Sequence, residues 1–195
     1  MNEILSAQAG RIVDCAQELI AAGGYNGFSY ADISERVGIT KASIHHYFPK
    51  KADLVRVLVQ RYRGVAAAGL ATLAEKVPLP AQRLNAYASW WSTCIGDGSA
   101  PICICAMLAA EVPALPAEVA AEVRSYFVEL AGWLEAAIAA GKTDGSFNSE
   151  LDPAIEAEAF MATVHGAMLS ARVSGNPLLF DRSVHAALAR LGVSR

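Results

Sequence analysis

The sequence is poor in charged residues and contains no apolar run long enough to cross a membrane. Only 18% of its 195 residues are charged, whereas 54% are hydrophobic, so the chain can bury a large core and is not disordered as a whole. No window of about 18 residues is apolar and free of charge, and the N-terminus lacks the basic, apolar and small-residue order of a signal peptide. We therefore expect a globular, cytoplasmic protein with no membrane partner.

Cysteine is also scarce. Cys15, Cys94, Cys103 and Cys105 are too few and too scattered for a disulfide framework, and a reducing compartment would keep them as thiols. Cys15 falls on the apolar stripe of the first predicted helix, where cysteine behaves as a small hydrophobe. The other three could join His165 around zinc, but their spacing is unlike that of a structural zinc site. We expect no metal and no cofactor.

The motifs of several enzyme classes are missing. The chain has no glycine-rich phosphate loop, no Ser/His/Asp order in the local context of a hydrolase, and no H-E-x-x-H or C-x-x-C pair. It also has no credible strand, low-complexity tract or internal repeat. The sequence therefore predicts an all-α protein that is not an enzyme.

What the sequence does contain is a helical pattern from end to end. Apolar residues recur at i, i+3, i+4 and i+7 between breaks at proline and glycine. Gly141–Asp152 is interpreted as a turn. About nine helices are predicted: 6–22, two short helices within 28–48, 51–76, 81–95, 102–112, 117–140, 153–174 and 177–191.

The most informative stretch is residues 28–53. Ser29 and Asp32 are spaced as a capping box, and Thr40 is placed as a second N-cap. Gly38 lies between them, where a sharp turn favours a positive φ. Two short helices joined by a tight glycine turn are typical of a helix-turn-helix. The hydrophobic staple positions around the two caps are filled by Phe28 and Ile33, and by Ile39 and Ile44.

Charge is distributed unevenly between the two ends of the chain. Residues 1–63 carry eight Lys/Arg and six Asp/Glu, a net charge of +2, whereas 64–195 carry eight and thirteen, a net charge of −5. The second helix of the motif is mostly polar from Thr40 to Tyr47, with donors suited to phosphates and base edges. A polyanion partner is therefore expected at the N-terminal end.

The helix predicted over 51–76 begins in the small N-terminal part and continues into the large part. No Gly/Ser-rich or Pro-rich tract separates them, so this helix is a mechanical connector rather than a flexible linker. We divide the chain into a three-helix DNA-binding domain, 1–50, and a helical domain, 51–195.

In these residues the chain resembles the TetR family of transcriptional regulators. In that family the motif runs on into two aromatics, His, Phe, two further residues and Lys-x-x-Leu. The equivalent stretch here is His45-His46-Tyr47-Phe48-Pro49-Lys50-Lys51-Ala52-Asp53-Leu54. Gly38, Phe48 and Lys51 match the pattern. His45 stands where the family usually has a DNA-contacting tyrosine, and Tyr47 where it often has histidine, so the family's operator preference does not carry over.

The resemblance implies a repressor that binds a palindromic double-stranded DNA operator as a homodimer and is released by a small-molecule inducer. Aromatic and electrophilic compounds are two candidate inducer classes. Lys41 and Lys51 are expected mainly to clamp phosphates. The expected DNA-binding residues are Ser29, Tyr30, Thr40, Lys41, Ser43, His45, His46, Tyr47 and Lys51.

The domain 51–195 is expected to bind the ligand and to form the dimer. Aromatic and soft side chains suited to an apolar pocket are Tyr87, Trp90, Trp91, Cys94, Cys103, Met107, Tyr126, Phe127, Phe160 and His165. Small and apolar residues permit close approach of helices, and the family builds its dimer from the last two helices. The expected interface residues are Ala157, Met161, Val164, Met168, Ala171, Val184, Leu188 and Leu191.

Two alternatives remain open at this point. Cys103 and Cys105 follow Pro101, and some members of the family that sense electrophiles or oxidants have a cysteine in this region, so the protein could be a thiol-based sensor. Against this, Glu111 is the nearest charge and would raise the pKa of a thiol, and two buried small hydrophobes explain the pair better. The other alternative is a helical interaction protein that does not bind DNA.

Overall fold

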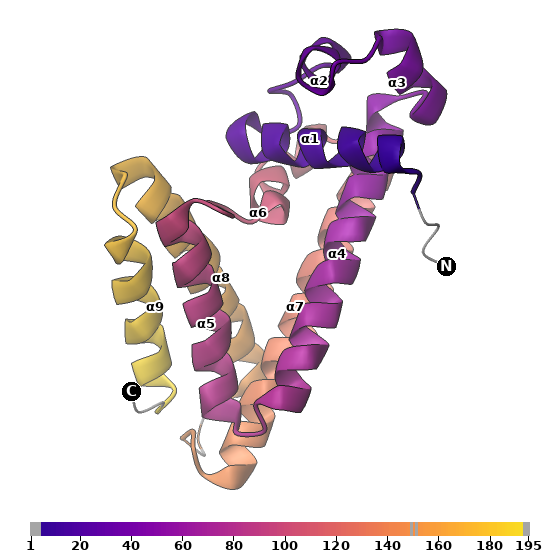
Figure 1. Ribbon diagram of the computed structural model, residues 1–195. Coiled ribbons are helices and arrows are strands. Elements are labelled where there is room, and N and C mark those ends of the chain that lie inside the picture. Colours follow the sequence, from indigo (N-terminus) through magenta and orange to yellow (C-terminus); the bar gives the residue numbers. More distant parts are fainter. Residues whose placement is uncertain (1–4, 149, 151, 193–195) are drawn as a thin grey trace. The chain divides into compact units, whose positions relative to one another are not determined.

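The computed structural model describes residues 5–148, 150 and 152–192, and these residues form nine α-helices and one short 3-10 helix with no strand (Figure 1). The predictions of an all-α fold and of nine helices are confirmed. None of the helices described is long and apolar enough to cross a membrane. Their bounds are α1 Ala7–Gly23, α2 Tyr30–Val37, α3 Lys41–Tyr47, α4 Lys51–Lys76, α5 Pro80–Asp97, α6 Ile104–Ala109, η1 Val112–Ala114, α7 Ala117–Asp144, α8 Pro153–Ser174 and α9 Leu178–Arg190.

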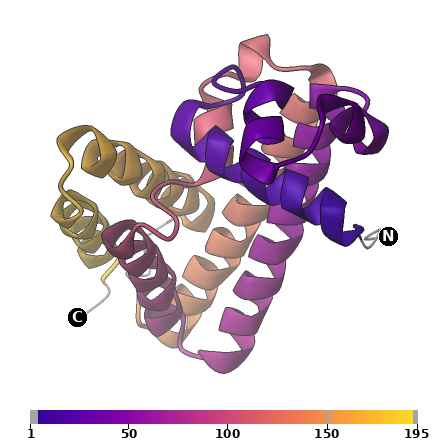
Figure 2. The ribbon, with the colours of Figure 1, turned by 45° about the horizontal axis from the view of Figure 1, so that its top comes forward.

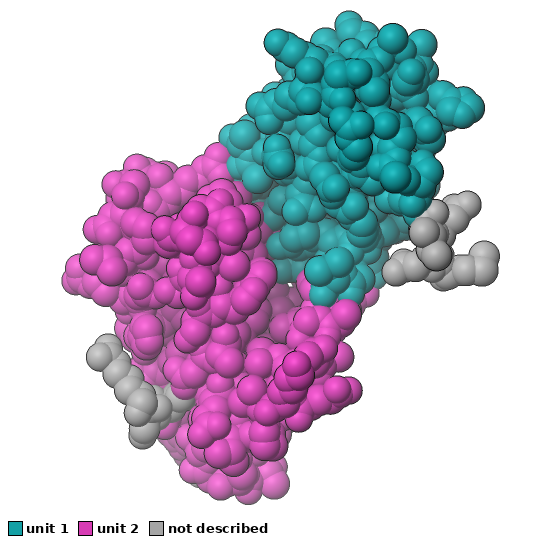
Figure 3. Space-filling model, in the orientation of Figure 1, with its two compact units in different colours: residues 1–65, 104–126 teal, residues 66–103, 127–195 magenta. Residues whose placement is uncertain are grey.

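The chain folds into two compact units, coloured separately in Figure 3. Unit 1 comprises the residues up to 65 together with 104–126, and unit 2 comprises 66–103 and the residues from 127 onward. The long helices α4 and α7 contribute one part to each unit. The helix-turn-helix therefore shares unit 1 with α6 and with the start of α7, which are remote from it in sequence.

The predicted caps form in the structure. The Asp32 carboxylate accepts hydrogen bonds from the backbone N–H (2.7 Å) and the hydroxyl (2.8 Å) of Ser29, which completes the capping box. Thr40 Oγ1 accepts the backbone N–H of Ser43 at 3.1 Å. Gly38 ends α2 in the left-handed conformation, with φ of 73°. Both short helices thus begin and end where the sequence predicts.

Unit 1 has its core between the first three helices and the start of α4. The three-helix core predicted from the sequence is present, except that Ile39 is only half-buried. Val65 of α4, the last residue of this part of unit 1, is 69% exposed. The buried apolar residues of α1 to α4 include Ile12, Ile20, Ile33, Val37, Ile44, Phe48, Leu54 and Leu58.

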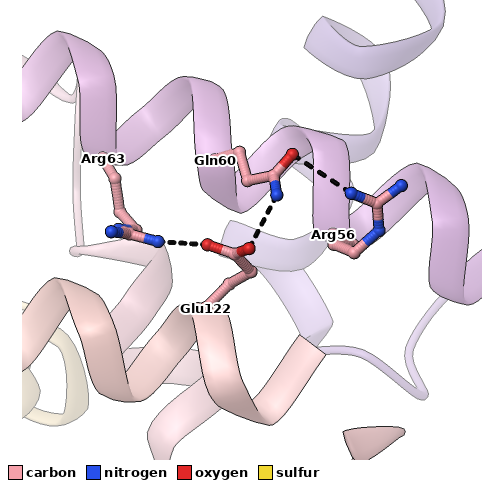
Figure 4. A network of polar contacts seen from close by, with 4 residues as sticks. All are labelled: Arg56, Gln60, Arg63 and Glu122. Atoms are coloured by element: carbon pink, nitrogen blue, oxygen red, sulfur yellow. Dashed lines mark hydrogen bonds and ion pairs between the residues drawn. The ribbon is translucent and has the colours of Figure 1, made fainter. Parts of the chain in front are cut away.

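A polar network joins α4 to the start of α7 within unit 1 (Figure 4). The Glu122 carboxylate forms an ion pair with Arg63 and accepts a hydrogen bond from Gln60 Nε2 at 2.6 Å. Arg56 in turn donates to Gln60 Oε1 at 3.3 Å. The charged groups of Arg63 and Glu122 are largely shielded from water, with side chains 22% and 17% exposed, so this pair is held more firmly than a surface ion pair.

Two helix ends differ from the prediction. α7 continues to Asp144, so the turn begins four residues later than the expected start at Gly141. Gly141 is not a helix stop, because the ring of Phe147 packs over it and an added Cβ would lie 2.1 Å from Phe147 Cδ2. The predicted helix 102–112 is shorter, ending at Ala109. Ser149 and Leu151 of the expected turn lie outside the described residues.

Unit 2 is built from α5, α8, α9 and the second halves of α4 and α7. α8 and α9 lie side by side in both views (Figures 1 and 2), and α5 packs against α9, where Ser92 donates to Asp181 Oδ1 at 2.5 Å. Trp133 Nε1 donates to the Leu70 carbonyl at 3.2 Å, joining α7 to α4. The buried face of α5 includes Tyr87 and Trp91.

Candidate nucleic-acid interface

Helix α3 is fixed to unit 1 by a single buried side chain. Ile44 is fully buried, and Phe48, which follows the helix, is 4% exposed. The remaining surface carries an ammonium, two imidazoles and a phenol, which are groups that bind phosphates and base edges. The exposed residues of α3 are Lys41, Ala42, His45, His46 and Tyr47.

The turn before α3 fixes the orientation of this exposed face. Ser34 Oγ donates to the Ile39 carbonyl at 2.5 Å, and the N–H of Ile39 donates to the Ser34 carbonyl at 3.2 Å. The hydroxyls of Thr40 and Ser43 lie 2.9 Å apart and hydrogen-bond to each other. Thr40 is exposed and Ser43 half-buried, so both hydroxyls remain at the surface beside the start of α3.

His45 is held in one orientation. Its Nδ1 lies 3.1 Å from the carbonyl oxygen of Pro49, and its ring packs edge-on against Tyr30 at 4.8 Å between centroids. A carbonyl oxygen can only accept a hydrogen bond, so Nδ1 carries the proton of this contact. The neutral ring then offers Nε2 as an acceptor. This geometry gives His45 a different chemistry from the tyrosine that the family usually has there.

Two of the predicted DNA-binding residues form hydrogen bonds within unit 1 that support α2 and α3. The hydroxyl of Tyr30 donates to the Phe48 carbonyl at 2.8 Å, and the side chain is buried. Burial raises the pKa of Tyr30 above its usual value. Ser29 is exposed, but its hydroxyl is used in the cap of α2.

Lys51 also turns toward the protein. Its Nζ donates to the Phe28 carbonyl and lies over the rings of Phe28 and Tyr25, 4.0 and 4.7 Å from their centroids. Burial lowers the pKa of Lys51, and the nearby carboxylates of Glu111 and Asp32 oppose that shift. The ammonium therefore fastens the loop before α2 to the start of α4.

The predicted ligand-binding residues do not all lie in one unit. Met107 and Tyr126 belong to unit 1, where the ring of Tyr126 packs on that of Tyr62 at 5.6 Å. Trp90 is in unit 2 but is 55% exposed. Phe127, half-buried, packs edge-on against His165 at 5.1 Å. Those buried in unit 2 are Tyr87, Trp91, Cys94, Cys103, Phe160 and His165.

All four cysteines are buried thiols. Cys103 and Cys105 have no exposed surface, Cys103 directly before α6 and Cys105 within it. Burial raises the pKa of Cys15. Within the described ranges, no group of three or more His, Cys, Asp or Glu side chains is arranged to hold a metal ion. Full burial favours the interpretation of Cys103 and Cys105 as small hydrophobes.

The predicted dimer residues lie mainly inside the protomer. Seven of the eight are buried within the single chain, and Met161 is half-buried, so they pack α8 and α9 against their own unit. Periodicity identifies an apolar stripe but not the surface that covers it. The opposite face of α8 is also rich in small and apolar residues, all exposed except the half-buried Ala159: Ile155, Ala159, Ala162, Gly166, Leu169 and Val173.

Three residues of structural importance could not be identified from the sequence. Glu111, Glu122 and Trp133 each bind a partner between 59 and 86 residues away in the chain. Glu111 accepts hydrogen bonds from the loop between α1 and α2. A single sequence offers no signal for such pairs, because a long-range contact leaves no local periodicity.

The fold and the exposed helix α3 define a DNA-binding transcriptional regulator of the helix-turn-helix class. Comparison with known families gives two matches: Bacterial regulatory proteins, tetR family, over residues 12–58, and Tetracyclin repressor-like, C-terminal domain, over residues 80–187. The chain belongs to the TetR family of transcriptional regulators.

Several solved structures are similar to this one along nearly the whole chain. A TetR-family regulator from Agrobacterium tumefaciens is 48% identical, with a TM-score of 0.93 over 95% of this chain and 97% of that one. A TetR regulator from Legionella pneumophila is 25% identical, with a TM-score of 0.84 over 97% and 100%. The reduced form of E. coli NemR, at 18% identity and a TM-score of 0.86 over 97% and 99%, shares the fold. No curated protein matched the chain in sequence.

Proposed function

We propose that the protein is a repressor that binds a palindromic operator as a homodimer, in the cytoplasm, and leaves it when a small molecule binds unit 2. The observation that carries the proposal is the exposed face of α3. Buried Ile44, the N-cap Thr40 and the C-cap Phe48 hold this helix in place, while its polar side chains point to solvent. A short helix of this kind offers few base contacts, so two copies related by a two-fold axis are needed to read a site.

The contacts divide into two kinds. Lys41 is the phosphate clamp, because its ammonium is exposed at the start of α3. His45, His46 and Tyr47 are the candidates for base edges, with His45 Nε2 accepting from the amino group of adenine or cytosine. Thr40 and Ser43 add hydroxyls, which can bind either phosphates or bases. Ser29, Tyr30 and Lys51 position α3 from behind.

The second copy would pack on the exposed stripe of α8. Three large apolar side chains of this helix are exposed: Ile155 (63%), Leu169 (47%) and Val173 (89%). This is an unusually large apolar surface for one helix of a monomer. The stripe residues follow one another at intervals of four and three, the spacing of a helix that packs against a nearly parallel partner. Leu178 at the start of α9 is 63% exposed and would extend the interface.

The ligand would enter the aromatic core of unit 2. Tyr87 packs against Trp133 at 5.7 Å, and Phe127 against His165 at 5.1 Å. These side chains suit an apolar, aromatic compound. His165 Nε2 is buried and has no hydrogen-bond partner in the part of the chain that the structure describes, so it is a polar group that a ligand would satisfy. Exposed Trp90 and the unit 1 residues Met107 and Tyr126 are not placed in this set.

Selection of bound sequences from a pool of random DNA duplexes tests the proposal. The protein is expected to enrich an inverted repeat whose half-sites lie about one helical turn apart or farther. A variant in which Lys41 is replaced by Glu should enrich nothing, because the change repels a phosphate in each half-site. Failure of the wild-type protein to enrich any sequence would contradict the proposal.

A further inference from the structure

The loop between α1 and α2 is held by a carboxylate from a distant part of the chain. Glu111, between α6 and η1, accepts hydrogen bonds from the backbone N–H of Tyr25 at 2.7 Å and of Asn26 at 3.4 Å. It also accepts one from Asn26 Nδ2 at 3.1 Å. All of these residues belong to unit 1, in which α1 packs against α6. One side chain thus occupies three donors of the loop.

The backbone of the loop is shaped to receive this carboxylate. Gly24 has φ of 74° and ψ of −169°, a conformation that essentially only glycine adopts. A Cβ at Gly24 would lie 2.0 Å from Glu111 Oε1. Any other residue would therefore be strained in its backbone and would also displace Glu111. The backbone conformation of Gly24 and the close approach of Glu111 to it both indicate that the loop is shaped for this carboxylate.

Lys51 fastens the other end of the same loop. Its ammonium donates to the Phe28 carbonyl, and Ser29, the next residue, is the N-cap of α2. The loop that leads into the helix-turn-helix is therefore fixed by an acid at Tyr25 and Asn26 and by a base at Phe28. α2 in turn carries the turn that orients α3.

We propose that Glu111 is a positioning residue for the helix-turn-helix, and that its bonds to Tyr25 and Asn26 fix the loop before α2 in the conformation on which operator affinity depends. The chain passes from unit 2 into unit 1 at Ile104, the first residue of α6, only seven residues before Glu111. Glu111 therefore ties the loop before α2 to the part of unit 1 that follows this crossing. This inference rests on the proposed repressor function and adds a residue outside α2 and α3 on which operator affinity depends.

The test compares Glu111→Gln and Glu111→Ala with the matched control Glu135→Gln, which removes the same charge from an exposed position of α7. The Gln variant keeps the shape of the side chain and protects the test if the Ala variant fails to fold. Two quantities are measured: the affinity for the duplex selected by the wild-type protein relative to a scrambled duplex, and the hydrogen-exchange rate of the Tyr25 and Asn26 amides.

We expect the Glu111 variants to lose about tenfold or more in operator affinity, because bonds to a charged acceptor are lost, and to exchange both amides at least about tenfold faster. Binding to scrambled DNA should match that of the Glu135→Gln control. If the Glu111 variants keep the wild-type ratio of operator affinity to scrambled-duplex affinity, the inference is overturned, whether or not the two amides exchange faster. If the wild-type protein prefers no sequence at all, the proposed function itself fails, which is a different result from a loss confined to the variants.

Discussion

Replacing Lys51 by methionine separates the two roles that this lysine could have. Methionine keeps an unbranched apolar side chain and removes the ammonium. The change deletes a hydrogen bond from a charged donor to the Phe28 carbonyl, worth about 1.5–3 kcal/mol, and two cation–π contacts worth about 0.5–1 kcal/mol each. Relief of the partly buried charge, whose pKa is lowered by burial, offsets part of this loss. The expected net cost is about 2 kcal/mol of unfolding free energy.

Urea unfolding at fixed protein concentration measures this cost, with exposed Lys50→Met as the control. The role of each lysine in DNA binding is measured by the salt dependence of operator affinity. Each phosphate contact contributes about 0.9 to the slope of log affinity against log salt, so loss of one contact per protomer lowers the slope of a dimer by about 2. We expect that change for Lys41→Met and not for Lys51→Met. If Lys51→Met leaves stability within about 0.5 kcal/mol of wild type and lowers the slope by about 2, Lys51 is a phosphate clamp and the structural role is wrong.

Three further predictions concern stability and assembly. Tyr30→Phe should lower the unfolding free energy by about 1 kcal/mol. Because burial raises the pKa of Tyr30, the stability that its hydroxyl contributes is present below pH 10 and is lost above it. The unfolding free energy of the variant should therefore fall less steeply above pH 10 than that of the wild type, and parallel plots of unfolding free energy against pH would contradict this. The substitutions Glu122→Gln and Arg63→Ala should each lower the unfolding free energy, and a double-mutant cycle should give a coupling energy of about 1 kcal/mol or more. If the two losses of unfolding free energy simply add in the double mutant, the ion pair does not stabilise the protein. Leu169→Asp should give a monomer in sedimentation at micromolar concentration, whereas Val128→Asp, an exposed position on α7, should not; a Leu169→Asp dimer would place the interface elsewhere.

The fold could be predicted because its signals are local. Caps, turn glycines and apolar spacing each depend on residues within one or two turns of helix, so Ser29, Thr40 and Gly38 act in the structure as their positions in the sequence indicate. The helix-turn-helix and the nine helices follow from them. The end of α7 was misplaced because Gly141 is set by packing under Phe147, which a helix-stop rule does not include.

The individual site residues were harder to assign because their roles depend on what covers them. Lys51 and Tyr30 have side chains suited to DNA, yet the structure directs both polar groups to backbone carbonyls of unit 1. The stripe containing Met168 and the opposite stripe containing Leu169 are both apolar on α8, and only burial separates them. Glu111 reads as an ordinary surface charge until its partners, Tyr25 and Asn26, are seen.

The central claim, that the exposed face of α3 reads the operator, is tested most directly by repeating the duplex selection with His46 and Tyr47 both changed to alanine. Both side chains are exposed, so the variant should keep its fold. The account predicts that base preference changes at one or two positions, placed symmetrically in both half-sites, while preference elsewhere is retained. A selected sequence identical to that of the wild-type protein would contradict it.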